Sequence, residues 1–196
     1  MKSRSASGCL VGVIALLGLA AFLFWRARTP PQVGENFSQL PPATQQQRRT
    51  EAKQFLDQVH GIQESARRKE HRTFTLEVSE AVLNTLLQDN LHTDKFQVRD
   101  LRAGLEPNQL TLQGHVIYNQ FDAIATLTGN VTVADGKLVY QADSLKIGGM
   151  KAPNQWKDKT ERVVTQQLNG LLKNAPGRIE HVTVAQQKLI IEGVID

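Results

Sequence analysis

The chain has 196 residues, of which 40% are hydrophobic and 21% charged, a composition that excludes a wholly disordered or collagen-like protein. A single cysteine excludes an internal disulfide framework, and the five histidines show no spacing typical of a metal site. The net charge of +4 is unevenly divided, since Met1–Arg72 has 11 basic and 5 acidic residues whereas Thr73–Asp196 has 12 and 14. Because the basic excess lies beside an apolar segment, a membrane surface is favoured over nucleic acid as its partner.

That apolar segment, Cys9–Trp25, is a run of 17 residues without a charged or strongly polar side chain. As a helix it would be about 25 Å long, at the short end for a bilayer core of roughly 30 Å. Lys2 and Arg4 precede it and Arg26 and Arg28 follow it, so basic side chains at both ends can extend its reach to the interface. The pattern predicts a single membrane-spanning helix.

We interpret this helix as an uncleaved signal anchor at residues 9–25, with residues 1–8 as a short cytoplasmic tail. The rest of the chain would then be extracytoplasmic, attached to the cytoplasmic (inner) membrane by one pass. Two alternatives remain open: cleavage of a signal peptide after Ala20, and a lipoprotein modified at Cys9.

A proline-containing linker at residues 26–43 is predicted to precede a helix at residues 44–72. Ala52, Phe55, Val59 and Ile62 repeat at helical spacing and give that helix one narrow apolar stripe. The remaining faces are polar, and we predict an amphipathic stem between the membrane and the folded domain.

Basic residues gather at the end of this stem, at Arg67, Arg68, Lys69 and Arg72. A functional interpretation is attraction to anionic lipid headgroups, at about 1 kcal/mol per basic residue near a membrane. The alternative is a solvated helix terminus in which cations complement the helix dipole.

Beyond Thr73 the hydrophobic period changes to two, which predicts a strand at Thr73–Val78 and then a helix capped by Ser79. Further strands are predicted at 96–105, 110–118, 121–133 and 138–147, with a bulge near Arg99–Asp100 and a two-residue hairpin turn at Asp135–Gly136. A second helix at 153–174 and two final strands complete the chain.

The predicted order from residue 73 is strand, helix, four strands, helix and two strands. Short connections make the strands antiparallel, so we expect an α+β domain at residues 73–196. The long strands, the bulges and two glycines within strands, Gly114 and Gly129, favour a strongly curved sheet packed on two apolar helices.

No catalytic motif in the sequence has the residue spacing that its chemistry requires. Gly129 and Gly136-Lys137 do not form a phosphate-binding loop, and no zinc-protease, nucleophile-elbow or calcium-loop pattern is present in the sequence. Asp135 is explained by its turn, and His115 and His181 by their strands. We therefore predict a protein that is not an enzyme and has no catalytic residues, cofactor or metal site.

Three stretches of the domain resemble a known group of proteins. Thr75–Leu87 reads as a strand followed by a Ser-Glu-x-x-Leu-Asn-x-Leu-Leu helix, Leu110–Gly114 as a short strand ending in glycine, and Ile179–Gly193 as paired terminal strands. This pattern is similar to that of the LmeA-like and YpmS-like families of membrane-anchored lipid-binding proteins, distant relatives of the tubular lipid-binding fold. The resemblance covers residues 73–196 and implies phospholipid binding in a groove, without catalytic residues.

The predicted elements by themselves also favour lipid binding. Long apolar helices packed against a curved sheet can leave an elongated cleft suited to an acyl chain. Membrane lipids are then the expected partner, in addition to any envelope protein. The alternative is that the apolar residues fill the core and that the domain is a protein-interaction or scaffold module of an envelope complex. Candidate lipid contacts are the apolar residues of the two helices: Val82, Leu83, Leu86, Leu87, Trp156, Val163, Val164, Leu168 and Leu171.

Overall fold

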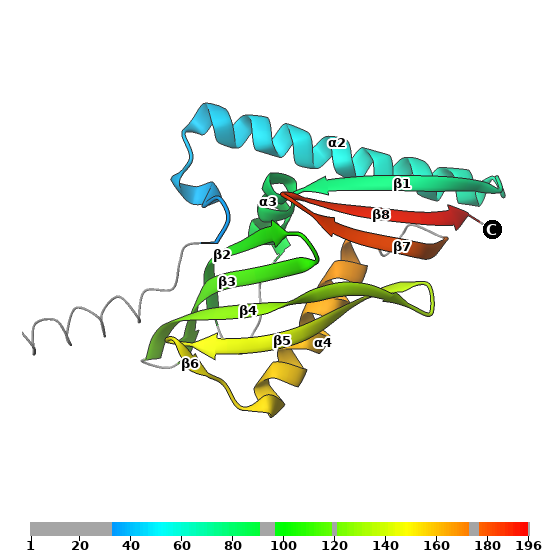
Figure 1. Ribbon diagram of the computed structural model, residues 1–196. Coiled ribbons are helices and arrows are strands. Elements are labelled where there is room, and N and C mark those ends of the chain that lie inside the picture. The colour runs from blue at the N-terminus through cyan, green and yellow to red at the C-terminus, as the bar shows by residue number, and fades with distance from the viewer. Residues whose placement is uncertain (1–32, 91–96, 119–120, 173–176, 196) are drawn as a thin grey trace, which may run out of the picture. The chain divides into compact units, whose positions relative to one another are not determined.

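The computed structural model describes residues 33–90, 97–118, 121–172 and 177–195, all within one compact unit that begins at Gln32. It has the predicted α+β fold, with antiparallel strands and three α-helices (Figure 1). The predicted membrane anchor at 9–25 and its flanks lie outside the described residues. Within the described ranges, no helix combines the length and the apolar character needed to cross a bilayer.

The element order after residue 73 is the predicted one, with one short strand added after the fifth. A short 3-10 helix before α2 is also new. The elements are η1 (Phe37–Gln39), α2 (Pro42–Arg67), β1 (Arg72–Ser79), α3 (Glu80–Asn90), β2 (Gln97–Glu106), β3 (Gln109–Tyr118), β4 (Phe121–Ala134), β5 (Lys137–Ile147), β6 (Met150–Lys151), α4 (Asn154–Leu171), β7 (Arg178–Ala185) and β8 (Lys188–Ile195).

The strands form two antiparallel sheets, in place of the single sheet expected from the sequence. One sheet has the order β1-β8-β7 and the other β2-β3-β4-β5-β6. Hairpin turns of the larger sheet bond to β7, through Asn108 N–H to the Val184 carbonyl at 2.9 Å and Ile179 N–H to the Gly136 carbonyl at 3.2 Å. The two sheets therefore meet through turns and side chains instead of through a continuous ladder.

The predicted irregularities of the larger sheet are confirmed. The register between β2 and β3 shifts between Arg99 and Arg102, and both residues of the Asp135–Gly136 turn have positive φ, as a type I′ hairpin requires. Gly129 lies at the register shift between β4 and β5. A Cβ at Gly129 would lie 2.2 Å from the Gln141 carbonyl oxygen, so the strands approach this closely only because that side chain is absent.

Helix α2 packs on the domain and does not project from it as a separate stem. Ala52, Phe55, Val59 and Ile62 are all buried within the main core, and α2 contacts α3, β1 and β8. The predicted apolar stripe of this helix is confirmed, and the residues that bury it belong to the folded domain. The helix begins at Pro42, with Pro41 as its N-cap, because proline is tolerated where a helix leaves its first N–H groups unpaired.

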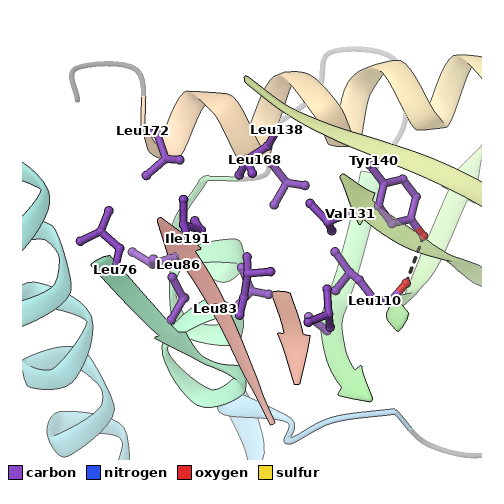
Figure 2. Close-up of a cluster of buried hydrophobic side chains, with 14 of the residues drawn as sticks. Leu76, Leu83, Leu86, Leu110, Val131, Leu138, Tyr140, Leu168, Leu172 and Ile191 are labelled. Carbon is purple, nitrogen blue, oxygen red and sulfur yellow. Dashed lines mark hydrogen bonds between the residues drawn. The ribbon is translucent and has the colours of Figure 1, made fainter. Parts of the chain in front are cut away.

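The core is one contiguous cluster that both sheets and all three helices contribute to (Figure 2). Leu168 lies in the last turn of α4 and Leu172 directly follows the helix, and Figure 2 shows both in the same cluster as Leu138 and Ile191. The Tyr140 hydroxyl donates to the Leu110 carbonyl at 3.1 Å, and burial raises the pKa of this phenol well above its ordinary value. The centre of the domain is therefore occupied by side chains.

Candidate functional site

Helix α3 is fastened to the open edge of β2 by two polar side chains one helical turn apart. The Asn84 side-chain amide donates to the Ala103 carbonyl at 3.0 Å and its oxygen accepts the Ala103 N–H, while the Glu80 carboxylate accepts the Leu105 N–H at 2.8 Å. Ser79 caps the helix by accepting the Val82 N–H. The Ser-Glu-x-x-Leu-Asn motif thus has a structural role, since it fixes the direction of the buried face of α3.

Helix α4 is fastened to the edge of β5 in the same way, through a longer series. Asn169 bonds both the N–H and the carbonyl of Leu138, at 3.1 and 2.6 Å. Thr165 does the same for Tyr140, at 3.0 and 3.5 Å. Farther along the strand, the Glu161 carboxylate accepts the Ala142 N–H and the Lys157 ammonium donates to the Ala142 carbonyl, both at 2.9 Å.

These contacts are possible because the axial rise of four helix residues is close to that of two strand residues. Four residues of an α-helix rise about 6.0 Å, and two residues of a strand span about 6.8 Å. Three side chains at every fourth position of α4, Glu161, Thr165 and Asn169, therefore meet every second residue of β5 and replace a neighbouring strand. Lys157, one turn earlier, adds a second contact to Ala142. The sequence analysis did not predict that these side chains bond to a strand edge. The signal that could have indicated it is the four-residue spacing of the polar side chains along the helix.

A cavity of about 350 Å³ lies between α2, α3 and α4. It is not between the sheet and the helices, where the sequence placed an elongated cleft. Its described lining consists of four residues of α2, one of α3 and three of α4: Leu56, Val59, His60, Gln63, Leu86, Gln167, Gly170 and Leu171.

The lining combines buried apolar side chains with exposed polar residues. Val59 and Leu86 are buried, whereas His60, Gln167 and Gly170 are exposed. No aspartate, glutamate, lysine or arginine is among these described lining residues. Small-molecule sites are typically concave, with apolar walls and a few polar groups. This cavity lies at the small end of their size range, and half of its described lining residues have apolar side chains.

The structure brings two of the nine predicted lipid contacts, Leu86 and Leu171, into the cavity wall. The others are distributed between the core and the surface. Val82, Leu83 and Leu168 are buried in the core, and Leu87 and Val164 pack against it. Val163 is half-buried, and Trp156, at 59% exposed, lies in the first turn of α4, away from the cavity residues at its other end. The α2 residues of the wall were not predicted, because their helix was assigned to a separate stem.

The predicted membrane-surface residues Arg67, Arg68, Lys69 and Arg72 are all exposed at the end of α2 and the start of β1. Arg68 forms an ion pair of 2.9 Å with Glu70, which reduces the net positive charge of the group. Lys69 has a positive φ at the helix end. The group is accessible to an anionic surface, and it also complements the C-terminal end of the α2 dipole.

Among the described residues, no group of three or more histidine, cysteine, aspartate or glutamate side chains is placed to hold a metal ion. Comparison with known proteins gave no match, either to a family model, to a curated protein or to a solved structure.

Proposed function

We propose that this protein is a non-catalytic lipid-binding module of the cell envelope, which holds an acyl chain in the cavity between α2, α3 and α4. The observation that carries the proposal is a cavity of about 350 Å³ whose described lining includes four apolar side chains and no aspartate, glutamate, lysine or arginine. Each methylene that a chain buries contributes about 0.8 kcal/mol, so such a site needs shape more than charged contacts. The volume favours one acyl chain, with the rest of the lipid outside.

The wider proposal includes the sequence-based expectations about location. Residues 9–25 would anchor the chain in the cytoplasmic membrane by a single pass, with the domain outside the cytoplasm and membrane lipids as its partners. The resemblance to the LmeA-like and YpmS-like families supports the same function. The exposed basic residues at the end of α2 support proximity to lipid headgroups.

The two helix glycines provide a test with a matched control. A Cβ added at Gly170 or at Gly61 would meet no atom within 4 Å, but only Gly170 is among the residues that line the cavity. A phenylalanine at either position also removes a helix-weakening glycine. Leu86→Trp is less suitable, because Leu86 is 5% exposed and overpacking there would itself cost about 1–3 kcal/mol.

We expect Gly170→Phe to weaken binding of cis-parinaric acid at least tenfold and Gly61→Phe to leave it within twofold, both variants remaining folded. Binding is measured by fluorescence titration of delipidated residues 32–196, which contain every described element, with thermal unfolding as the folding check. Native mass spectrometry of the same protein before delipidation tests for a copurified lipid. Absence of both lipid and titratable binding would contradict the proposal and favour a protein-interaction module.

A further inference from the structure

Two large apolar side chains are exposed in the described part of the chain, Met150 at 73% and Trp156 at 59%. They are six residues apart, on β6 and in the first turn of α4. Isolated exposed apolar residues are common on protein surfaces. These two differ because they lie on either side of one short connection, whereas the other large apolar residues described are at least partly buried.

The backbone holds this corner of the domain in place. The Gly148–Gly149 turn joins β5 to β6, and Met150 pairs with Ile147 across it. Gly148 N–H donates to the Ile124 carbonyl at 2.9 Å, and Ala152 N–H donates to the Leu145 carbonyl at 2.8 Å. Because both flanks of Met150 are tied to neighbouring strands, its exposure is a property of the fold.

The same corner is basic. Residues 146–159 contain four lysines and one acidic residue, Asp158. Lys157 is turned toward the Ala142 carbonyl and lies 3.6 Å from Asp158. The other three lysines of this corner are exposed and form no ion pair with any described residue: Lys146, Lys151 and Lys159.

We propose that the β6–α4 corner is a membrane-contact site, at which Met150 and Trp156 enter the interface of an anionic bilayer while the surrounding lysines bind lipid headgroups. Tryptophan favours the headgroup level of a membrane because its ring is apolar and its N–H is polar. Lysines at this level gain from the negative surface potential, by about fivefold in affinity for each residue. Two side chains are too little apolar surface for a stable protein–protein interface, which buries about 800 Å² per partner.

This site is separate from the cavity. Trp156 and Gly170 are both on α4, and their separation of 14 residues corresponds to about 21 Å along the helix axis. Membrane contact at the corner is therefore independent of whether the cavity holds an acyl chain.

The test uses the full chain with Trp25→Phe, which leaves Trp156 as its sole tryptophan. The protein is reconstituted into vesicles of phosphatidylcholine, or of phosphatidylcholine and phosphatidylglycerol in equal parts, with or without brominated acyl chains. We expect the brominated chains to quench Trp156 fluorescence, and to do so several-fold more strongly in the anionic vesicles.

Charge reversal supplies the matched control. Lys151→Glu with Lys159→Glu should reduce quenching in the anionic vesicles to the level of phosphatidylcholine alone. Lys53→Glu with Lys137→Glu makes the same charge change at exposed residues elsewhere and should leave it unchanged. Absence of quenching, equal quenching in the two compositions, or equal loss in both charge variants would overturn the proposal. Gly170→Phe should not alter the quenching, which separates this result from the test of the cavity.

Discussion

At the scale of single residues, Tyr140 combines packing with one specific polar contact. It has no exposed surface, and its hydroxyl donates to the Leu110 carbonyl across the sheet interior. Burial is the largest cause of its raised pKa, followed by the negative charges of Asp143 and Glu161. All three effects disfavour the phenolate, so Tyr140 stays protonated at pH values where an ordinary tyrosine ionises.

This predicts a specific effect at alkaline pH. A tyrosine in the unfolded chain ionises near pH 10, whereas folded Tyr140 holds its proton, so the unfolded state binds fewer protons and the free energy of unfolding falls as the pH rises above about 10. Tyr140→Phe should cost about 1 kcal/mol at pH 7 through the lost hydrogen bond, and the cost should shrink above pH 10. Urea unfolding of both proteins at pH 7 and pH 11 measures this, and a cost that does not change with pH would contradict the pKa direction.

At the scale of elements, the helices cover strand edges that are otherwise open. β2 and β5 are at or near the edges of the larger sheet, and unpaired edges invite pairing with other chains. α3 covers part of β2 with Glu80 and Asn84, and α4 covers β5 from Leu138 to Ala142. This arrangement also places the C-terminal end of α4 beside the cavity. The polar side chains by which α4 bonds to β5 therefore position one wall of the candidate site.

We predict that Thr165→Val combined with Asn169→Leu destabilises the domain by about 2–4 kcal/mol, because the Leu138 and Tyr140 N–H groups lose their partners and each such loss costs about 1–3 kcal/mol. The opened edge should also promote self-association. Chemical denaturation and analytical ultracentrifugation measure the two effects. Gln166→Val is the control, since Gln166 is exposed on the same helix and outside the series. A double variant as stable as this control would show that the series does not hold α4 in place.

At the scale of the whole described domain, α2 is part of the core and closes one side of the cavity. Phe55 is 4% exposed and Val59 3%, and Val59 also lines the cavity. Arg48 links the start of α2 to the preceding segment through an ion pair with Glu35 at 3.3 Å, and it also pairs with Glu51 within the helix at 3.0 Å. The candidate site therefore depends on packing between a helix near the beginning of the domain and one near its end.

Phe55→Ala should accordingly lower the free energy of unfolding of the entire domain by about 3–5 kcal/mol, as expected for a buried aromatic residue. Gln54→Ala, at the exposed neighbouring position, should change it by less than about 0.5 kcal/mol. Far-ultraviolet circular dichroism during denaturation measures both. If Phe55→Ala left the unfolding of the strands unchanged, α2 would be an independent element, as the sequence first indicated.

The sequence determined those features that depend on near neighbours in the chain. Alternating residues identified the strands, Asp135–Gly136 the hairpin turn, and the helical repeat of Ala52, Phe55, Val59 and Ile62 the buried face of α2. Periodicity shows that a face is buried but not what buries it, and so α2 was assigned to a separate stem.

Only the tertiary structure decided which elements meet. The division into two sheets, the side-chain series on β5 and the cavity between three helices all depend on contacts between residues far apart in sequence. The same reason applies to Leu83 and Leu86 of α3. Both leucines are buried in the core, but of the two only Leu86 also lines the cavity. A leucine at a helical repeat has the same local signature in either place, and the packing of distant elements alone distinguishes them.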